Sequence, residues 1–446
     1  MKRLLVFLML FGLIAAFSTT AGAVDLKFSG EYYAAGMYMD KTDLRKDHGP
    51  STAFYYQRLR VRTDFIVAPG LTLITRFDAM ERAWGAARTA TGTGLAADST
   101  GTIAENENIA FDWAYIEYKS PIGIFSAGYM NDGSTGTIFG NSYSPKGRIK
   151  YSNSYGSVKL NLAYTKEREA SFTATNAAIV ADNDNDKYGI EGVYSWKDGN
   201  AGVNVNYYRQ AANRSLGTNP YARRYFLVSP YAIAKFGPVA LQGEFNYAFG
   251  RDDYEFVYNK LTHDNKDVQS ISGWVDVTAD FKKIYVGGSI AYVSGDDPET
   301  NRIEGGIING GRDWNPCLIM FNYYDRAKWI GPLNGWNGTT DNGTMTNAWF
   351  FQVRGGFRPI DKLDIMASVS YARADKTLKP ANSYTWEGRD YGWEVDLVGS
   401  YKITNNLSYM LGAGCLFTGD WYSGTTATGQ DIQNNLMVIN KLTLTF

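Results

Sequence analysis

The connections between segments of this chain are the feature that most restricts its fold. After residue 24, apolar and polar residues alternate in eighteen segments, and the connections between these segments are alternately short and long. The short ones consist of turn residues, as in Ala68-Pro69-Gly70 and Gly237-Pro238, whereas the longest spans residues 295–344. Side chains alternate between two faces along a strand, and short turns at one end with long loops at the other are typical of a transmembrane β-barrel. The sequence therefore predicts an all-β, antiparallel transmembrane barrel.

We expect about eighteen strands, which would place both chain ends on the side of the short turns. Sixteen strands remain possible if the hairpin at residues 147–166 is misread. The expected strands are 26–39, 53–68, 70–84, 109–119, 123–130, 147–154, 157–166, 186–196, 201–210, 223–236, 239–250, 268–281, 284–294, 345–359, 362–374, 390–402, 406–417 and 434–446.

Only the first residues carry a long apolar run. A short basic stretch precedes the run from Leu4 to Phe17, and residues 21–23 have the small-residue pattern of a cleavage site. We expect residues 1–23 to be a secretory signal peptide and residues 24–446 to form one barrel domain. An uncleaved N-terminal membrane anchor is the alternative. Later segments lack the roughly 18 consecutive apolar residues that a membrane helix needs.

The stretch YYQRLRVRTDF, residues 55–65, shows which face of the barrel is polar. Arg58, Arg60 and Arg62 occupy every second position, and mostly apolar residues fill the positions between them. An arginine that faces lipid at mid-depth costs about 2–4 kcal/mol. We therefore expect the three arginines to face the lumen, where Asp64 and Asp78 would be bidentate partners for some of the guanidinium groups.

The expected lumen charges are unevenly distributed along the chain. The early strands supply mostly basic residues, and the later strands supply mostly acidic ones. We therefore expect a basic sector of the wall, which favours anions, to face a more acidic sector across the pore. The alternative is that these charges only brace the barrel. The predicted pore-lining residues are Arg58, Arg60, Arg62, Asp64, Arg76, Asp78, Arg82, Arg148, Lys150, Lys159, Glu244, Arg354, Glu394 and Asp396.

The long connection at residues 295–344 contains RDWNPCLIMFNYYDRAKW, which is rich in large apolar residues. Such a segment is expected to be covered rather than exposed to water. We expect it to fold into the lumen or to cap the mouth and narrow the pore, although a surface loop that contacts a partner is the alternative. The candidates for the constriction are Arg312, Asp313, Arg326 and Lys328.

Catalytic and metal-binding motifs are not evident in the sequence. The two histidines, His48 and His263, fall in expected loops, and the two cysteines, Cys317 and Cys415, form no metal-binding or haem-attachment motif. The stretch ADNDNDKYG half resembles a calcium loop, but Lys187 stands where a glycine is required. We therefore expect no enzyme activity, no cofactor and no metal site. The net charge of −1 gives no indication of a nucleic-acid partner.

Several stretches resemble known families. DWAYIEYKSPIGIFSAGYMND, residues 112–132, and GRIKYSNSYGSVKLNLAYT, residues 147–165, resemble hairpins of Gram-negative general porins. The layout around AYVSGDD, residues 291–297, is similar to that of alginate-export-type outer-membrane channels, whose fold is an eighteen-stranded barrel. The final strand ends at Phe446, as in outer-membrane barrels whose last residue is read by the insertion machinery.

The resemblance implies a passive channel in the outer membrane of a Gram-negative bacterium. The expected function is diffusion of small hydrophilic solutes or ions through a water-filled pore, with a bias toward anions. A substrate-selective polysaccharide or carboxylate channel, and a structural sheath or adhesin barrel, are the alternatives. The expected partners are outer-membrane lipid, lipopolysaccharide and small hydrophilic solutes, with a possible homotrimer and no nucleic acid.

Overall fold

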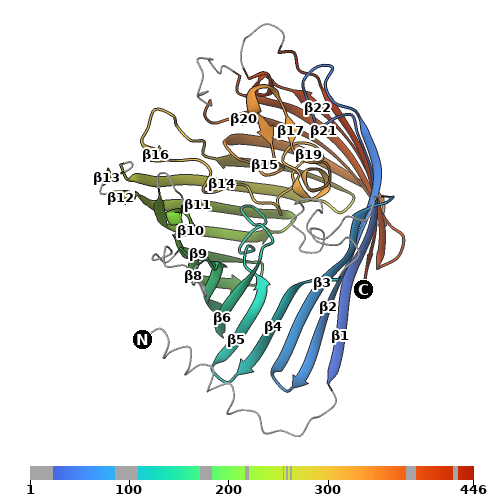
Figure 1. Cartoon of the computed structure of the whole chain (residues 1–446). Helices are drawn as coiled ribbons and strands as arrows, with labels where there is room; N and C mark the ends of the chain where they lie inside the picture. Colours follow the sequence, from blue (N-terminus) through green and yellow to red (C-terminus); the bar gives the residue numbers. More distant parts are fainter. Residues whose placement is uncertain are drawn as a thin grey trace.

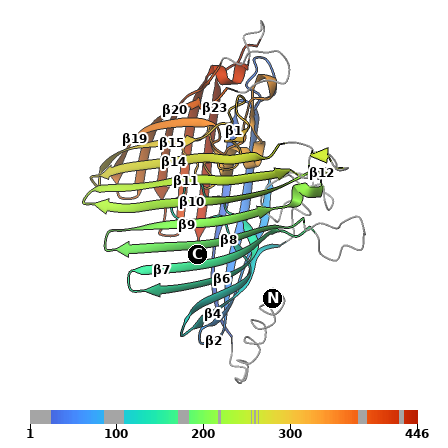
Figure 2. The ribbon, with the colours of Figure 1, turned by 90° about the vertical axis from the view of Figure 1, so that its left-hand side faces the viewer.

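The computed structural model describes residues 24–85, 109–170, 183–215, 220–254, 256–257, 260–261, 264–377, 388–424 and 430–446. The predicted signal peptide and His263 lie outside the described residues. Eighteen long strands form one closed antiparallel barrel (Figures 1 and 2), in which each strand pairs with the next and β23 pairs with β1. They are β1 (Asp25–Met39), β2 (Thr52–Ala68), β3 (Leu71–Ala83), β4 (Ala110–Ser120), β5 (Gly123–Asn131), β6 (Pro145–Tyr155), β7 (Val158–Arg168), β8 (Asn185–Trp196), β9 (Gly199–Gln210), β10 (Tyr221–Phe236), β11 (Val239–Tyr254), β14 (Lys266–Asp280), β15 (Ile284–Val293), β19 (Ala348–Ile360), β20 (Leu363–Ala374), β21 (Asp390–Lys402), β22 (Leu407–Thr418) and β23 (Asn435–Thr445).

The eighteen predicted segments all form barrel strands, and most of their bounds differ by only one or two residues. The sixteen-strand alternative is wrong, because β6 and β7 pair with each other from Gly147 opposite Lys166 to Tyr155 opposite Val158, and they also pair with β5 and β8. Short elements lie in the connections. They are β12 (Phe256–Val257), β13 (Lys260–Leu261), β16 (Arg302–Ile303), β17 (Leu333–Asn334), β18 (Thr340–Asp341), η1 (Ala212–Ser215), η2 (Tyr323–Ala327), α2 (Lys328–Ile330), η3 (Trp336–Gly338) and η4 (Asp420–Ser423). Within the described ranges, no helix is both long enough and apolar enough to cross a membrane.

Tight turns connect consecutive strands at one end of the barrel. Gly70 and Gly237 have φ values of 79° and 59°, a conformation that residues with a Cβ rarely adopt. β1 begins and β23 ends at this end of the barrel, where the Gly30 N–H donates to the carbonyl oxygen of Phe446 at 2.8 Å. An even number of strands requires this arrangement, as the sequence predicts.

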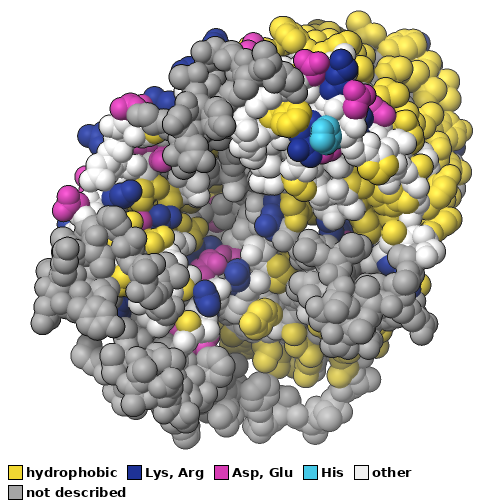
Figure 3. Space-filling model, turned by 45° about the horizontal axis from the view of Figure 1, so that its top comes forward, with side chains coloured by type: hydrophobic (Ala, Val, Ile, Leu, Met, Phe, Trp, Pro, Cys, Tyr) yellow, Lys and Arg dark blue, Asp and Glu magenta, His cyan; other side chains and the backbone are white. Residues whose placement is uncertain are grey.

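The outer face of the barrel is apolar. On β19, Trp349, Phe351 and Val353 are 42%, 41% and 71% exposed, whereas the alternate residues Phe350 and Gln352 are buried. The hydrophobic outer wall is visible in Figure 3, and charged side chains lie within the hollow at the end of the barrel. A continuous apolar belt around a closed barrel is stable against lipid hydrocarbon rather than water.

Two connections fold into the lumen, and we call them the inward loops. The long inward loop comprises residues 294–347, between β15 and β19, and the short inward loop comprises residues 132–144, between β5 and β6. Ile319, Met320 and Phe321 of the long loop are almost fully buried within the barrel. They belong to an apolar cluster with lumen-facing residues of the wall, including Phe350, Leu416, Met437 and Ile439. The alternative of a long loop exposed on the surface is therefore wrong.

Candidate functional site: a charged cavity beside the inward loops

The arginines of β2 lie on the lumen side of the barrel. Arg58 is opposite Tyr33 of β1, which is only 5% exposed, and Arg60 is opposite Asp78 of β3. Directly opposed residues in antiparallel strands share a face, so the alternation on β2 places Arg58, Arg60 and Arg62 toward the lumen. We call Arg58, Arg60 and Arg62, with Arg76 of β3, the arginine wall.

The arginines of this wall have carboxylate partners. Arg60 donates from Nε and Nη2 to the two oxygens of Asp78, both at 2.6 Å. Arg62 makes the same bidentate contact with Asp64 at 2.7 and 3.0 Å. Paired geometry of this kind fixes the guanidinium plane and its direction. Asp78 and Asp64 are therefore bidentate partners of Arg60 and Arg62, as expected from the sequence.

Arg76 is buried against neighbouring side chains, and its guanidinium group is not exposed to the lumen. It donates to both oxygens of Asp112 at 3.1 and 2.5 Å. Its guanidinium also lies 4.0 Å from the ring centre of Trp113 and 4.3 Å from that of Tyr143. Arg76 is only 8% exposed, and its contacts with Asp112 and Tyr143 connect β3 with β4 and with the short inward loop. Asp112 lies in the porin-like stretch but is not among the predicted pore-lining residues.

A β-bulge on β3 reverses the face of the next residues. The register shifts between Gln57 and Leu59 of β2, and Met80 has a φ of 53°. Arg82 consequently lies opposite Gln57, on the face that points away from the lumen. The expectation that Arg82 lines the pore is wrong, because it assumed uninterrupted alternation. The same bulge directs Glu81 to the lumen, where it is 3% exposed and forms an ion pair with Lys328.

The long inward loop contributes two of its four predicted constriction residues to a cavity beside the arginine wall. Asp313 and Lys328 line this cavity, which has a volume of about 370 Å³. Arg326 is fully buried instead, where it pairs with Asp341 at 3.1 Å and supports the loop. Arg312 lies with its guanidinium 4.9 Å from the ring centre of Tyr323. The cavity is lined by Tyr33, Arg58, Arg60, Asp78, Asp112, Tyr143, Pro145, Asp313, Tyr324, Lys328 and Lys441.

The charges around this cavity nearly balance. Its lining contains four cationic and three acidic side chains. Three of the cations also have acidic partners outside the lining, since Arg58 lies 2.9 Å from Glu31, Lys441 lies 3.0 Å from Asp325 and Lys328 contacts Glu81. The lumen surface therefore has strong local dipoles and little net charge. Such a surface orients polar solutes more than it attracts one sign of ion.

The short inward loop was not predicted to enter the lumen, and Glu244 of β11 holds it there. Thr137 donates to Glu244 Oε2 from its backbone N–H at 3.3 Å and from its hydroxyl at 2.8 Å. The two inward loops also contact each other, since the Gly140 N–H donates to the carbonyl oxygen of Gly310 at 2.9 Å. Near its centre the loop carries the apolar pair Ile138 and Phe139, and Phe139 packs against Trp274 and Trp314.

A second cavity lies on the other side of the short inward loop. It has a volume of about 530 Å³ and its lining includes the predicted residues Arg148, Lys150, Lys159 and Glu244. Arg148 forms an ion pair with Asp132, with Nε 2.8 Å from one carboxylate oxygen, and Lys187 pairs with the other oxygen of the same carboxylate. The inward loops thus separate two polar spaces within one barrel.

Part of the acidic sector expected across the pore is covered by the long inward loop. Glu394 and Asp396 of β21 are 0% and 3% exposed because the long inward loop lies over them. Asp276 is engaged by Arg354, whose two terminal nitrogens lie 2.7 and 2.8 Å from its oxygens. The expectation that Glu394 and Asp396 line the open pore is therefore wrong. Sequence alternation fixes the face of a side chain but not whether a loop covers that face.

Comparisons with known proteins agree with the barrel fold. No protein-family model matches the sequence. No curated protein is similar enough in sequence to match it. Among solved structures, OccK11 (OpdR) of Pseudomonas aeruginosa superposes with a TM-score of 0.52 at 12% identity, over 95% of this chain and 96% of that chain.

Two further structures of Pseudomonas aeruginosa are similar to the same degree. OccK2 (OpdF), solved in complex with glucuronate, has a TM-score of 0.51 at 12% identity over 94% of this chain and 98% of its own. The outer membrane protein OprD has a TM-score of 0.51 at 12% identity over 96% and 95%. The chain therefore shares its barrel fold with these outer-membrane proteins of Pseudomonas aeruginosa.

Proposed function

We propose that this protein is a passive channel for small hydrophilic solutes in the outer membrane of a Gram-negative bacterium. The observation that supports it most is the cavity of about 370 Å³ between the arginine wall and the long inward loop. A closed apolar barrel isolates this polar space from lipid, and charged side chains from both the wall and the loop line it. A loop folded against one wall narrows the lumen of a barrel.

A bias toward anions is a finer part of this proposal. Arg58, Arg60 and Lys328 present their charged groups to the same cavity. Their carboxylate partners reduce the net positive charge, so we expect a weak bias in ion permeability. Recognition of Phe446 by the insertion machinery and assembly into a homotrimer stay predictions.

A channel selective for small carboxylates is the second candidate. It is supported by the guanidinium groups of Arg58 and Arg60 at the cavity and by the aromatic rings of Tyr143 and Tyr324 in the same lining. Guanidinium groups recognise carboxylates by paired hydrogen bonds. The similar structure of OccK2 holds glucuronate, which carries a carboxylate. The sheath and adhesin alternatives have no comparable supporting observation.

Liposome swelling tests the proposal. Purified, folded protein is reconstituted into liposomes, which are diluted into isosmotic glucose, sodium glucuronate or a series of larger sugars, with protein-free liposomes as the control. We expect swelling that slows as the solute becomes larger, because the inward loops narrow the lumen. Faster entry of glucuronate than of glucose would favour the carboxylate candidate. Absence of swelling with every solute would contradict a channel function.

A further inference from the structure

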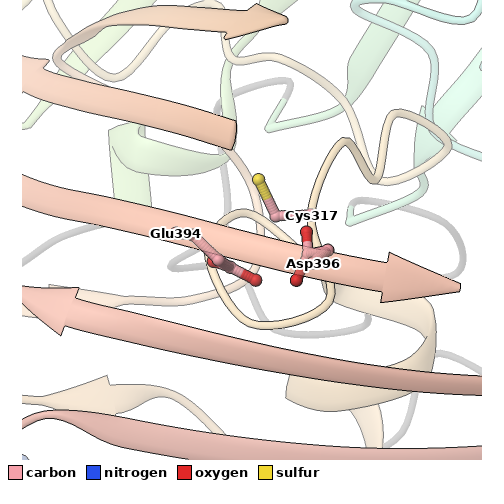
Figure 4. A group of neighbouring side chains, drawn as sticks. All are labelled: Cys317, Glu394 and Asp396. Carbon is pink, nitrogen blue, oxygen red and sulfur yellow. The ribbon is translucent and has the colours of Figure 1, made fainter. Parts of the chain in front are cut away.

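Three side chains with metal-binding atoms meet where the long inward loop lies on the barrel wall. Cys317 belongs to the loop, and Glu394 and Asp396 project from β21 beneath it (Figure 4). Their ligand atoms all lie within 4.8 Å of one another. Each of the three residues is at least 96% buried, so bulk water does not solvate the two carboxylates.

The two carboxylates lack a cationic partner. No lysine, arginine or histidine within the described parts of the chain forms an ion pair with Glu394 or Asp396 at 4.0 Å or less. Glu394 accepts hydrogen bonds from the backbone N–H groups of Ile319 and Met320 at 2.6 and 2.7 Å. These contacts compensate part of the charge, but two adjacent buried carboxylates without a counterion are costly.

One oxygen of the cluster is also unsatisfied. Asp396 Oδ1 is buried and receives no hydrogen bond from an N–H or hydroxyl group of the described residues, whereas Oδ2 lies 3.5 Å from the Ser368 hydroxyl and 3.4 Å from the Leu318 nitrogen. A side chain at Gly414 would crowd this oxygen, because an added Cβ would lie 2.5 Å from Oδ1. A buried polar atom without a donor is uncommon, and a bound water or ion is one of the groups that can satisfy it.

We propose that Cys317, Glu394 and Asp396 form a zinc site that fastens the long inward loop to the barrel wall. Zn²⁺ binds thiolate sulfur and carboxylate oxygen at about 2.0–2.3 Å, which places its ligand atoms within the spacing of this cluster after small side-chain rotations. A thiol ligand disfavours Ca²⁺ and Mg²⁺, which prefer oxygen. On binding, the Cys317 thiol releases its proton to solvent, and the metal charge compensates the two carboxylates.

The proposed zinc site is independent of the channel function, since it concerns how the loop is held rather than what passes beside it. The three ligands come from distant parts of the sequence and form no motif, so only the pairing of loop and wall reveals them. A metal bond between loop and wall would stabilise the folded protein, because the metal binds the folded state more tightly than the unfolded chain.

Metal titration of the full-length barrel tests the site. Folded protein in detergent is stripped with a chelator, dialysed against Zn²⁺ or Co²⁺, and analysed for bound metal and for thiolate-to-Co²⁺ charge-transfer absorption. The test variants are Cys317→Ser and Asp396→Asn. Cys415→Ser is the matched control, because Cys415 is a free cysteine on β22 that lies opposite the outward-facing Leu436.

We expect one equivalent of metal and a thiolate absorption band in the natural protein and in Cys415→Ser. Cys317→Ser should lose the band, and both test variants should bind Zn²⁺ at least about tenfold more weakly. Zinc should raise the unfolding temperature of the natural protein but not that of Cys317→Ser. If a test variant does not fold, the natural protein and Cys415→Ser still decide the question. Failure of both to bind metal with a thiolate band would overturn the proposal and leave the carboxylates as a pair that shares a proton.

Discussion

At the scale of single residues, ion pairs determine the charge of the passage. Arg60 lies at the cavity with Asp78 as its bidentate partner, and the side chain of Asp78 is only 2% exposed. Removing one member of such a pair has two effects, because it deletes one charge and leaves the opposite charge without compensation. Ion selectivity should therefore respond more strongly to a broken pair than the small net charge of the lining suggests.

Arg60→Gln should move the reversal potential in a salt gradient toward that of a more cation-selective pore. The substitution removes a positive charge and exposes the negative charge of Asp78 to the passage. Arg358→Gln is the matched control, since Arg358 is paired with Asp280 and Asp364 at 2.9 Å but lies at the turn end of β19 and does not line the cavity. Equal shifts in both variants, or none in Arg60→Gln, would limit the arginine wall to a bracing role.

Protonation of the Asp132 carboxylate should determine how acid affects the short inward loop. Burial alone would raise the pKa of Asp132, but Lys187 and Arg148 beside it hold that pKa below its ordinary value. A carboxyl with a lowered pKa stabilises the fold above the unfolded-state pKa of about 4, and this contribution is lost as the pH falls through the folded-state pKa. Current fluctuations in open channels should therefore stay constant from pH 8 to 5 and increase below about pH 4.

The Asp132→Asn variant provides the control for this acid effect. It lacks the negative charge at every pH, so its fluctuations should already be increased at pH 7 and should change little in acid. A natural protein whose currents fluctuate equally at pH 7 and pH 3 would contradict the role of Asp132 in holding the loop.

At the scale of elements, the inward loops convert a wide barrel into a narrow passage. The long loop has its own apolar and hydrogen-bonded core, in which Arg326 donates to the carbonyl oxygen of Ile319 at 2.6 Å and pairs with Asp341. The wall supplies the complementary surface through Phe350 and the carboxylate of Glu394. The loop therefore behaves as a folded insert that covers one side of the lumen.

Replacement of residues 306–343 by a short Gly-Ser linker should increase the single-channel conductance several-fold. The strands β15 and β19 pair with each other independently of the loop, so the barrel should persist. Electrophoretic heat-modifiability reports whether the barrel is folded, and planar-bilayer recording measures the conductance. Replacement of the exposed residues 298–301 in the same way is the control, which should leave the conductance unchanged. An unchanged conductance without residues 306–343 would show that the loop does not restrict the passage.

At the scale of the whole molecule, the sequence predicts the barrel well because lipid and water impose a period of two on every strand. The strand number, the pairing order and the inward position of the long loop follow from local patterns. The bulge at Met80, which turns Arg82 outward, has no signal in the alternation itself. The burial of Glu394 and Asp396 depends on the path of a loop distant in sequence, so the sequence places them correctly on the lumen face and wrongly in open solvent.

Single-channel current across a planar bilayer tests the central claim, a water-filled passage beside the inward loops, most directly. Folded protein added to one side should produce discrete, ohmic steps of uniform size, and these steps should be smaller than those of the protein that lacks residues 306–343. Folded, heat-modifiable protein that inserts without producing steps would contradict the account, because the inward loops would then close the barrel rather than narrow it.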